Sequence, residues 1–371
     1  MQNVLFIMGS LGGGGAERVL IDLLNNIDRN ELSITLLLID AFKGIYIHQI
    51  PSDIEVIKVY NKNPGIKRRV LYKFPDLSRR LLKRDVDKKL GNRKFDAIIS
   101  WCEGRTFSAH STILERAHKN ITWVHTNLDA NHWTAWCWSK RHTEEDAYSL
   151  MDDIVFVSEG ARSAFQRKFG ISNNLHTIYN VIDRESIIKK AEEQKIEKEK
   201  FTIINVGRLE AQKRQDHIIE VAKILKERNY DFEVWILGVG SKEKELKDYT
   251  KALGVDDRVK FLGFNPNPYP YIKAADMFLL TSDTEGYPTV ICEALCLGTP
   301  IVSTNITGSD ELLANGIGIL TTLDVTSIAN SVEKLIVNQE LRRKLSNRAI
   351  EKSKEFNPEN VLSQIYSLVK S

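Results

Sequence analysis

Residues 201–237 read FTIINVGRLEAQKRQDHIIEVAKILKERNYDFEVWIL. This stretch contains two short apolar runs, at 202–206 and 232–237, and an amphipathic segment between them, at 214–228. Runs rich in Val and Ile that alternate with amphipathic segments are typical of parallel strands buried between helices. The stretch therefore predicts a strand, a helix and a second strand of an α/β fold.

The same alternation continues on both sides of this stretch. Towards the N-terminus it predicts a helix at 16–26 and strands at 4–8, 34–39, 97–101, 120–125 and 153–157. Towards the C-terminus it predicts strands at 259–262, 277–280 and 301–304, and helices at 242–253, 269–275, 289–297 and 326–337. Two successive series of this kind predict two Rossmann-like domains.

Length and composition indicate where the two domains divide. The chain has 371 residues, and single domains usually have about 100–200 residues. Residues 184–200 are dense in Lys, Glu and Gln, which indicates a polar helix or a linker rather than a core element, and we place the linker between the domains there. We expect an N-terminal domain at 1–183 and a C-terminal domain at 201–356. The segment 357–371 reads as an amphipathic helix that completes the first domain.

The overall composition is that of an ordinary globular protein. Hydrophobic residues make up 42% and charged residues 27% of the chain, and the net charge is only +3, too small to imply nucleic acid by itself. The cysteines lack metal-ligand spacing; they are Cys102, Cys137, Cys292 and Cys296. No signal-peptide pattern is apparent, and no apolar run approaches the ~18 residues of a membrane span. We expect a cytoplasmic protein.

A run of four glycines, Gly12 to Gly15, follows the first predicted strand. Glycine lets backbone amides approach a ligand closely, and a helix N-terminus favours a phosphate. Gly14 and Gly15 are therefore candidates for an anion site, with tight packing of the turn as the alternative. A dinucleotide fingerprint with Asp40 on the ribose fits less well, because the third glycine of G-x-G-x-x-G is missing.

Two charged motifs lie at the ends of predicted strands in the second half. Arg208 and Lys213 follow the strand of the opening stretch, and Glu285 and Glu293 lie before and inside a predicted helix. Ligands of open α/β sheets bind beyond the carboxyl ends of the strands. There, two cations can neutralise a diphosphate and carboxylates can accept hydrogen bonds from ligand hydroxyls. Solvated surface charge is the alternative for each motif.

Together these motifs resemble the family-four retaining glycosyltransferases of GT-B fold. The resemblance rests on Gly207-Arg208 with Lys213, on Glu285 and Glu293 in E-x(7)-E spacing, and on the N-terminal Gly-Gly-Ala-Glu-Arg. It covers essentially the whole chain. It implies that Arg208 and Lys213 bind the diphosphate of a donor, Glu293 the ribose hydroxyls and Glu285 the hydroxyls of the donor sugar.

The resemblance also implies other site residues. Further donor-binding positions are Gly14, Gly15, Gly286, Thr289 and the backbone at Val290. His125, at the end of a predicted strand, is similar to the histidine that the family places beside the donor sugar; a structural hydrogen bond is the alternative. The loop from Glu285 to Thr289 lacks a second glycine that the family often has. Ser309 follows Gly308 where a Gly-Gly pair is frequent.

The resemblance implies two Rossmann-like domains that face each other across a cleft, the first on the acceptor side and the second on the donor side. It implies transfer from a nucleotide-diphosphate sugar, with a UDP-sugar favoured, to a glycan or lipid-linked acceptor, with retention of anomeric configuration. We expect no metal or other cofactor, because Arg208 and Lys213 can stabilise the leaving diphosphate. The D-x-D of Asp85 and Asp87 falls in a basic run and is interpreted as surface. The alternatives are a sugar-nucleotide epimerase of the same architecture and a non-catalytic nucleotide-sugar binding protein.

The stretch from Lys62 to Lys94 is strongly basic. It holds 13 Lys or Arg and three Asp, a net charge of +10. A solvated surface is one interpretation; contact with anionic lipid headgroups or a lipid-diphosphate acceptor is the other. A nucleic-acid-binding module is a third hypothesis for the chain. We favour the glycosyltransferase and expect no nucleic-acid partner. Four tryptophans of the same domain can stack on sugars, lie at a membrane interface or fill the core: Trp101, Trp133, Trp136 and Trp138.

Overall fold

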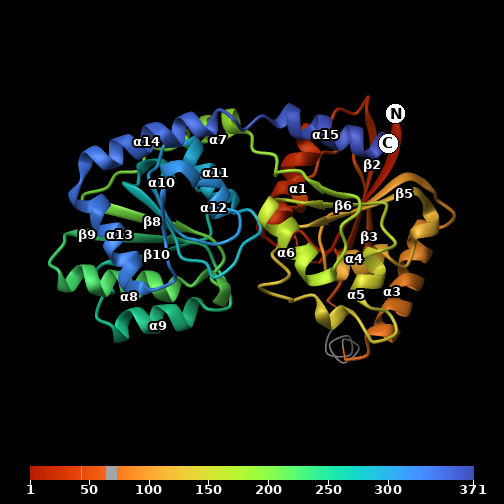
Figure 1. The fold of residues 1–371 in the computed structure, drawn as a ribbon, viewed down its shortest axis with the longest axis horizontal. Coiled ribbons are helices and arrows are strands. Elements are labelled where there is room, and N and C mark those ends of the chain that lie inside the picture. Colours follow the sequence, from red (N-terminus) through yellow and green to blue (C-terminus); the bar gives the residue numbers. More distant parts are fainter. Residues whose placement is uncertain (43, 64–72) are drawn as a thin grey trace. The chain divides into compact units, whose positions relative to one another are not determined.

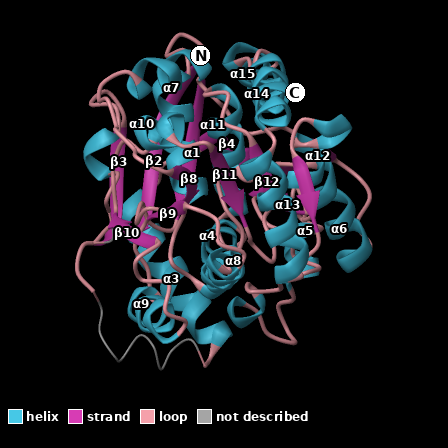
Figure 2. Ribbon diagram, turned by 90° about the vertical axis from the view of Figure 1, so that its left-hand side faces the viewer, coloured by secondary structure: helices cyan, strands magenta, loops and turns pink. Residues whose placement is uncertain are grey.

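The computed structural model describes residues 1–42, 44–63 and 73–371. It divides the chain into two units. Unit 1 comprises Met1–Val181 and Pro358–Ser371, and unit 2 comprises Ile182–Asn357. Helices, drawn in cyan, flank the strands, drawn in magenta, in Figure 2. Most strand residues are buried as a result.

In unit 1, the described residues form a seven-stranded sheet in the order β3-β2-β1-β4-β5-β6-β7, and every pair of neighbours is parallel. The strands are β1 (Gln2–Met8), β2 (Leu32–Asp40), β3 (Glu55–Tyr60), β4 (Phe95–Ser100), β5 (Ala117–Val124), β6 (Asp153–Phe156) and β7 (Leu175–Thr177). The α-helices are α1 (Gly15–Asn26), α3 (Pro75–Leu90), α4 (Arg105–His110), α5 (Glu144–Tyr148), α6 (Glu159–Phe169) and α15 (Pro358–Lys370). Short 3-10 turns are η1 (Ile47–Gln49), η2 (Leu114–Arg116) and η3 (Ala135–Cys137).

Unit 2 has a six-stranded parallel sheet in the order β10-β9-β8-β11-β12-β13. The strands are β8 (Phe201–Val206), β9 (Phe232–Leu237), β10 (Val259–Gly263), β11 (Met277–Leu280), β12 (Ile301–Thr304) and β13 (Ile319–Thr321). The α-helices are α7 (Arg184–Ala191), α8 (Gln215–Glu227), α9 (Glu243–Ala252), α10 (Tyr269–Ala274), α11 (Thr289–Cys296), α12 (Ser309–Leu312), α13 (Val325–Val337) and α14 (Gln339–Ser353). The 3-10 turns are η4 (Ala211–Lys213) and η5 (Ala314–Gly316).

The strand order is the same in both units. The first strand lies inside the sheet, the chain adds two strands on one side of it, and it then crosses to the other side. This is the order of a doubly wound Rossmann sheet, so the two predicted Rossmann-like domains are confirmed. Ligands of such sheets bind beyond the carboxyl ends of the strands where the order reverses. These switch points lie between β1 and β4 in unit 1 and between β8 and β11 in unit 2.

Sequence reasoning missed three strands, and each has a physical reason. The strands β7 and β13 contain three residues each, too few for a recognisable apolar run. The strand β3 lies at the edge of its sheet and alternates buried and exposed residues, so it lacks the continuous apolar pattern of a central strand.

Residues 184–200 are not a separate linker, contrary to the expectation from their polar composition. The helix α7 occupies the first part of this segment, and its Ile187 and Ala191 are buried in the apolar core of unit 2. The Asp183 carboxylate caps the helix by accepting the Ser186 N–H at 2.9 Å. The polar residues that suggested a linker occupy the exposed side of an amphipathic helix and the residues that follow it.

The C-terminal helix α15 lies with unit 1. In Figure 1 it runs beside α1, although the two helices stand at opposite ends of the chain. Its apolar residues Leu362, Ile365 and Leu368 are buried. The Asp28 N–H also donates to the Tyr366 hydroxyl at 2.7 Å. Burial of one face therefore holds the end of the chain on the first sheet.

Aromatic side chains fill the centre of unit 1. The indole rings of Trp101 and Trp123 stack with centroids 5.2 Å apart, and the Phe6 ring lies 6.1 Å from that of Trp101. The Trp101 Nε1–H donates to the Ala16 carbonyl at 2.8 Å. These contacts connect the carboxyl ends of β1, β4 and β5 with the start of α1.

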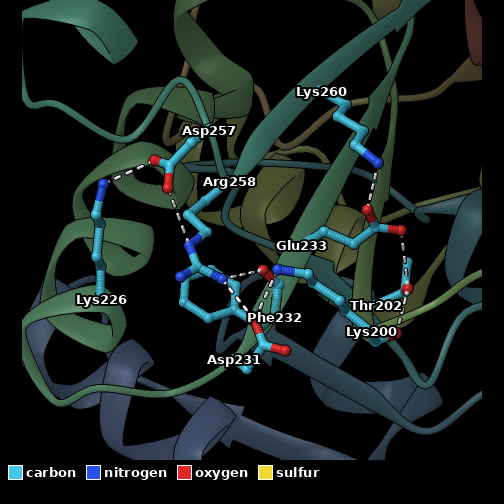
Figure 3. A network of polar contacts seen from close by, with 9 residues as sticks. All are labelled: Lys200, Thr202, Lys226, Asp231, Phe232, Glu233, Asp257, Arg258 and Lys260. Carbon is cyan, nitrogen blue, oxygen red and sulfur yellow. Dashed lines mark hydrogen bonds and ion pairs between the residues drawn. The ribbon is translucent and has the colours of Figure 1, made fainter.

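Ion pairs close the amino edge of the sheet in unit 2 (Figure 3). Asp231 accepts hydrogen bonds from Lys200 at 2.8 Å and from Arg258 at 2.7 Å. Lys226 pairs with Asp257 at 2.7 Å, and Glu233 pairs with Lys260. Lys200, Asp231 and Arg258 each stand directly before a strand. These three residues are therefore engaged at the edge opposite to the carboxyl ends of the strands.

The buried histidine of unit 1 leads to a prediction about acid stability. His110 is fully buried, with Nδ1 2.9 Å from Ser100 Oγ and Nε2 3.0 Å from Asn120 Oδ1. Burial lowers the pKa of its imidazole from 6.5 to about 4. The unfolded chain therefore takes up this proton at a higher pH than the folded chain. The resulting loss of unfolding free energy begins near pH 6.5 and grows by up to about 1.4 kcal/mol per pH unit towards pH 4.

Urea unfolding between pH 7 and pH 4.5 measures this loss. Tryptophan fluorescence reports mainly on unit 1, because five of the six tryptophans lie there: Trp101, Trp123, Trp133, Trp136 and Trp138. The variant His110→Gln should show a shallower dependence of stability on pH than the wild type. Equal slopes for the two proteins would contradict the assignment of this proton to His110.

Candidate functional site

Two loops at the carboxyl edge of unit 2 approach each other closely through their backbones, and Ser241 of one donates to Glu210 of the other. A Cβ atom on Gly238 would lie 1.8 Å from the Gly207 carbonyl oxygen, and one on Gly240 would lie 2.3 Å from the Leu209 carbonyl oxygen. The Leu209 N–H donates to the Val239 carbonyl at 3.1 Å. The loop after β8 can therefore lie against the loop after β9 only because positions 238 and 240 carry no side chain.

A third glycine positions the loop that contains Glu285. Gly308 has a φ of 80°, and a Cβ atom there would lie 2.6 Å from the Gly286 carbonyl oxygen. The next residue, Ser309, is fully buried and donates from Oγ to the Thr304 carbonyl at 2.7 Å. The second position of the expected Gly-Gly pair is therefore a serine that closes the turn with its hydroxyl.

Lys213 and Glu285 form an ion pair at the switch point of unit 2. The Lys213 Nζ lies 2.5 Å from Glu285 Oε1, and the same oxygen accepts a hydrogen bond from Ser282 Oγ at 2.8 Å. The Lys213 and Glu285 side chains are only 18% and 13% exposed. The backbone joins the two loops as well, since the Asp283 N–H donates to the Gln212 carbonyl at 2.9 Å. The sequence-predicted cation and carboxylate are thus brought together.

Arg208 differs from Lys213 in forming no ion pair within the described residues. Its charge adds to the hydrogen bonds from Ser241 in lowering the pKa of the nearby Glu210 carboxyl. The Arg208 side chain is exposed, and its guanidinium makes no hydrogen bond or ion pair with the part of the chain that the structure describes. Its backbone is fixed, because the buried Gln215 donates from Nε2 to the Arg208 carbonyl at 3.0 Å. A guanidinium on a fixed backbone is well suited to bind an anion.

The remaining predicted donor residues lie on α11 and the loop before it. Gly286 is buried, and Thr289 and Val290 form the first turn of the helix, where backbone N–H groups lack intrahelical acceptors. Glu293 is partly buried one turn further, and its Oε1 lies 3.4 Å from the Tyr269 hydroxyl. The helix therefore presents amides at its start and a carboxylate on its second turn.

In unit 1, the amides of the glycine loop are occupied by a carboxylate of the chain itself. Glu17 Oε2 accepts the N–H groups of Gly13 at 2.5 Å and Gly14 at 2.6 Å, and Glu17 Oε1 accepts the Ser10 hydroxyl at 3.0 Å. This arrangement caps α1, which begins at Gly15. Contact of Gly14 and Gly15 with a phosphate stays a prediction, and for the Gly14 N–H it requires Glu17 to move.

The other residue considered for a dinucleotide site is also engaged. Asp40 pairs with Arg105 at 3.1 Å, and both side chains are largely buried. A carboxylate held in this way neutralises a cation of its own unit. This geometry gives no support to a ribose contact by Asp40.

His125 is a neutral histidine with one engaged nitrogen. Its imidazole hydrogen-bonds to the Trp101 carbonyl, and burial lowers its pKa from 6.5 to about 3. Nε2 is buried and has no hydrogen-bond partner in the described ranges. A carbonyl oxygen only accepts, so the bonded nitrogen, Nδ1, carries the single proton of the neutral ring. Nε2 is therefore left as a hydrogen-bond acceptor.

Sequence reasoning missed Glu103, which supports the backbone at His125. Glu103 is 2% exposed, and it accepts the His125 N–H at 3.0 Å and the Thr126 hydroxyl at 2.6 Å. Burial raises the pKa of the Glu103 carboxyl. A single Glu outside any motif gives no signal in a chain this charged, although its position directly after a central strand was available from the sequence.

The D-x-D carboxylates lie on α3 and take part in surface ion pairs. Asp85 accepts the Tyr60 hydroxyl at 2.6 Å, and Asp87 pairs with Arg116 at 2.7 Å. Within the described part of the chain, no group of three or more His, Cys, Asp or Glu side chains is placed to hold a metal ion. The same residues contain no helix that is long and apolar enough to cross a membrane.

The basic stretch from Lys62 to Lys94 lies partly outside the described residues, which exclude 64–72. Some of its described charges are paired, such as Lys83 with Glu115 at 3.1 Å, whereas Lys88 and Lys89 are exposed on α3. Binding of this stretch to an anionic membrane stays a prediction.

The glycine contacts of unit 2 predict an asymmetry between two alanine substitutions. Gly238→Ala introduces a backbone clash at a φ of 144°, whereas Gly254→Ala, at a φ of 65°, has open space around the new Cβ. The control should lose about 1–2 kcal/mol of stability from backbone strain alone. Gly238→Ala should lose clearly more, in urea unfolding experiments on both variants. Similar losses would show that the two loops tolerate a side chain at 238.

Comparison with known proteins gives two adjoining family matches. Residues 13–186 match the family model described as Glycosyltransferase Family 4, and residues 186–352 match the model described as Glycosyl transferases group 1. The two matches meet at residue 186, close to the boundary between the two units.

Two relatives named as glycosyltransferases and one solved structure are also similar to this chain. A protein of Haemophilus influenzae named "Uncharacterized glycosyltransferase" is 24% identical over 97% of both chains. The N-acetylgalactosamine-N,N'-diacetylbacillosaminyl-diphospho-undecaprenol 4-alpha-N-acetylgalactosaminyltransferase of Campylobacter jejuni is 32% identical over 56% of this chain and 57% of its own length. The structure of Anabaena Alr3699/HepE in complex with UDP and glucose has a TM-score of 0.73 and 21% identity, with full coverage of both chains.

Proposed function

Because the chain belongs to the family-four glycosyltransferases of GT-B fold, we propose that it transfers a sugar from a UDP-sugar to a glycan or lipid-linked acceptor. The observation that carries this proposal is the arrangement of Arg208, Lys213 and Glu285 at the switch point of unit 2. Two cations and a carboxylate at this point match a ligand that joins a diphosphate to a sugar.

The proposed donor site uses the two cations differently. Arg208 forms no ion pair or side-chain hydrogen bond within the described residues, so its guanidinium can bind a diphosphate without breaking a contact. Lys213 pairs with Glu285. We propose that the diphosphate takes over Lys213, which frees the Glu285 carboxylate to accept hydrogen bonds from the hydroxyls of the donor sugar. The N–H groups of Thr289 and Val290 add the positive end of α11, and Glu293 accepts from the ribose.

His125 has the protonation state that sugar recognition requires. With a pKa of about 3 it is uncharged at neutral pH, and Nε2 is an acceptor. We propose that Nε2 accepts a hydrogen bond from a hydroxyl of the bound sugar. This bond would give the buried Nε2 the partner that it lacks within the described residues.

The identity of donor and acceptor draws on the relatives. The Anabaena protein was solved with UDP and glucose, which supports a UDP-sugar as the donor. The name of the Campylobacter enzyme includes a diphospho-undecaprenol acceptor, which supports a lipid-linked glycan. We further propose that the leaving diphosphate helps to deprotonate the acceptor hydroxyl on the same face of the sugar, so that the anomeric configuration is retained and no metal ion is needed.

Donor binding provides the first test. Lys213→Met should weaken UDP binding by about 10–100-fold in isothermal titration calorimetry, because one charge-assisted contact to the diphosphate is lost. Lys242→Met is the matched control, since Lys242 pairs with Glu245 on the surface of the same unit. Unchanged UDP affinity in Lys213→Met, or an equal loss in the control, would remove the proposed donor site.

Glu285→Gln separates competition for Lys213 from recognition of the sugar. UDP carries no sugar, so this variant should bind UDP at least as tightly as the wild type, because Lys213 no longer has a competing carboxylate. Transfer from UDP-sugars should fall by about 100-fold or more if Glu285 positions the sugar. Weaker UDP binding in Glu285→Gln would contradict the proposed exchange of partners.

The reaction type has its own test. NMR spectra of early product should show the anomeric configuration of the donor, and the rate should be unchanged in the presence of EDTA. An inverted linkage would overturn retention, and a loss of activity that Mg²⁺ or Mn²⁺ restores would overturn metal independence. Epimerised donor without a transferred product would favour the epimerase alternative.

A further inference from the structure

Trp133 differs from most tryptophans of unit 1. The indole rings of Trp101, Trp123 and Trp138 are buried, at 2%, 2% and 7% exposure, and cannot stack on a ligand without unpacking the core. Trp133 and Trp136 are both 41% exposed. The sequence-based expectation that tryptophans of this unit stack on sugars therefore reduces to these two.

The Trp133 ring is held in one orientation by its neighbours. Its Nε1–H donates to the Thr126 hydroxyl at 3.3 Å. Its far edge lies against Gly104, where a Cβ atom would approach ring atom Cη2 to 2.8 Å. Gly104 has a φ of 68°, a conformation that favours glycine. The indole is thus fixed at both ends although its surface is partly exposed, so a ligand can bind to it with little loss of side-chain entropy.

The hydrogen bond from Trp133 continues into the buried interior. Thr126 accepts from Trp133 and donates its own hydroxyl hydrogen to Glu103 Oε1 at 2.6 Å. The other oxygen of Glu103 accepts the N–H of His125. Trp133 and His125 are therefore joined through a single buried carboxylate. Since the indole N–H is already engaged, the aromatic face is the part of Trp133 that remains for contact with a ligand.

The neighbours of the Trp133 ring lie at the carboxyl edge of the sheet, where doubly wound sheets bind ligands. Glu103 and Gly104 belong to the loop after β4, and Thr126 belongs to the loop after β5. The loop after β4 borders the switch point of unit 1, where doubly wound sheets bind their ligands. Trp136, which has the same exposure, lines a different hollow, formed by the start of α3 and by Arg105 and Ser108 of α4.

We infer that Trp133 is the platform on which unit 1 holds a sugar ring of the acceptor. This inference rests on the proposed function. The C–H face of a pyranose is apolar and packs on the indole face, while its hydroxyls remain at the rim in water or on polar groups of the neighbouring loops. A glycan acceptor meets these requirements. Glu103 acts as a positioning residue that keeps Trp133 and His125 in a fixed relation.

The probes are methyl α- and β-glycosides of glucose, galactose, N-acetylglucosamine and N-acetylgalactosamine, which contain no aromatic group. Saturation-transfer NMR measures their binding to the wild type, Trp133→Ala, Trp133→Phe and Trp136→Ala. UDP binding and the melting temperature are measured on the same samples. Trp136→Ala is the matched control because it removes an equally exposed indole.

In the wild type, at least one glycoside should receive saturation at its ring protons. The signal should fall by about tenfold in Trp133→Ala, the order expected for loss of one aromatic stacking contact, and should be partly kept in Trp133→Phe. Trp136→Ala should match the wild type, and all four proteins should bind UDP equally.

Two results would overturn the inference. One is an unchanged glycoside signal in Trp133→Ala. The other is a wild type that binds UDP but gives no saturation-transfer NMR signal with any of the glycosides. Loss of UDP binding in Trp133→Ala at an unchanged melting temperature would assign the ring to the nucleotide and also overturn it. A wild type that fails to bind UDP at all contradicts the proposed donor site instead, so the two failures are distinguishable.

Discussion

The site of unit 2 depends on the close approach of the loops after β8 and β9. Gly238 and Gly240 leave room for the backbone of Gly207 and Leu209, and any side chain at either position would overlap it. This contact fixes the course of the chain from Arg208 to Lys213. Gly308 has the same effect on the loop of Glu285. The Lys213–Glu285 ion pair across the switch point depends on the positions of both loops.

The two edges of the same sheet use the same residue types for different purposes. At the amino edge, Asp231 bonds to Lys200 and Arg258, but its side chain is 69% exposed, so the pairs are screened by water and contribute little to stability. At the carboxyl edge, Glu285 is 13% exposed and has one cation and one hydroxyl as partners. The charges at the amino edge are therefore solvated surface pairs, whereas the Lys213–Glu285 pair is largely withdrawn from water; that it binds a ligand stays a proposal.

How far the sequence predicts this structure depends on the range of each interaction. Central strands and amphipathic helices were predicted within a few residues, because buried parallel strands require continuous apolar runs. Short strands such as β7 and β13 are determined by pairing with a neighbour, which a local pattern does not contain. The same is true of the 184–200 segment, whose polar composition hid the buried positions of Ile187 and Ala191.

The candidate site was predictable to a similar extent. Arg208, Lys213 and Glu285 were found because motif spacing identifies them, and the structure brings Lys213 and Glu285 into contact. Gly238 and Glu103 were missed. The requirement for glycine at 238 arises from a loop about 30 residues away in sequence, and the importance of Glu103 arises from donors in the loop after β5. No local sequence pattern around Gly238 or Glu103 indicates either requirement.

The electrostatics of the two units indicate a division of roles. In unit 1, Glu17 already supplies a carboxylate to the amides of the glycine loop, and His125 is uncharged with an acceptor nitrogen. A phosphate at this edge would have to displace one carboxylate, whereas a hydroxyl can donate directly to Nε2. In unit 2, Arg208 forms no ion pair within the described residues, and α11 presents its first amides. Within the proposed function, these differences favour unit 2 for the charge of the diphosphate and unit 1 for sugar hydroxyls and rings.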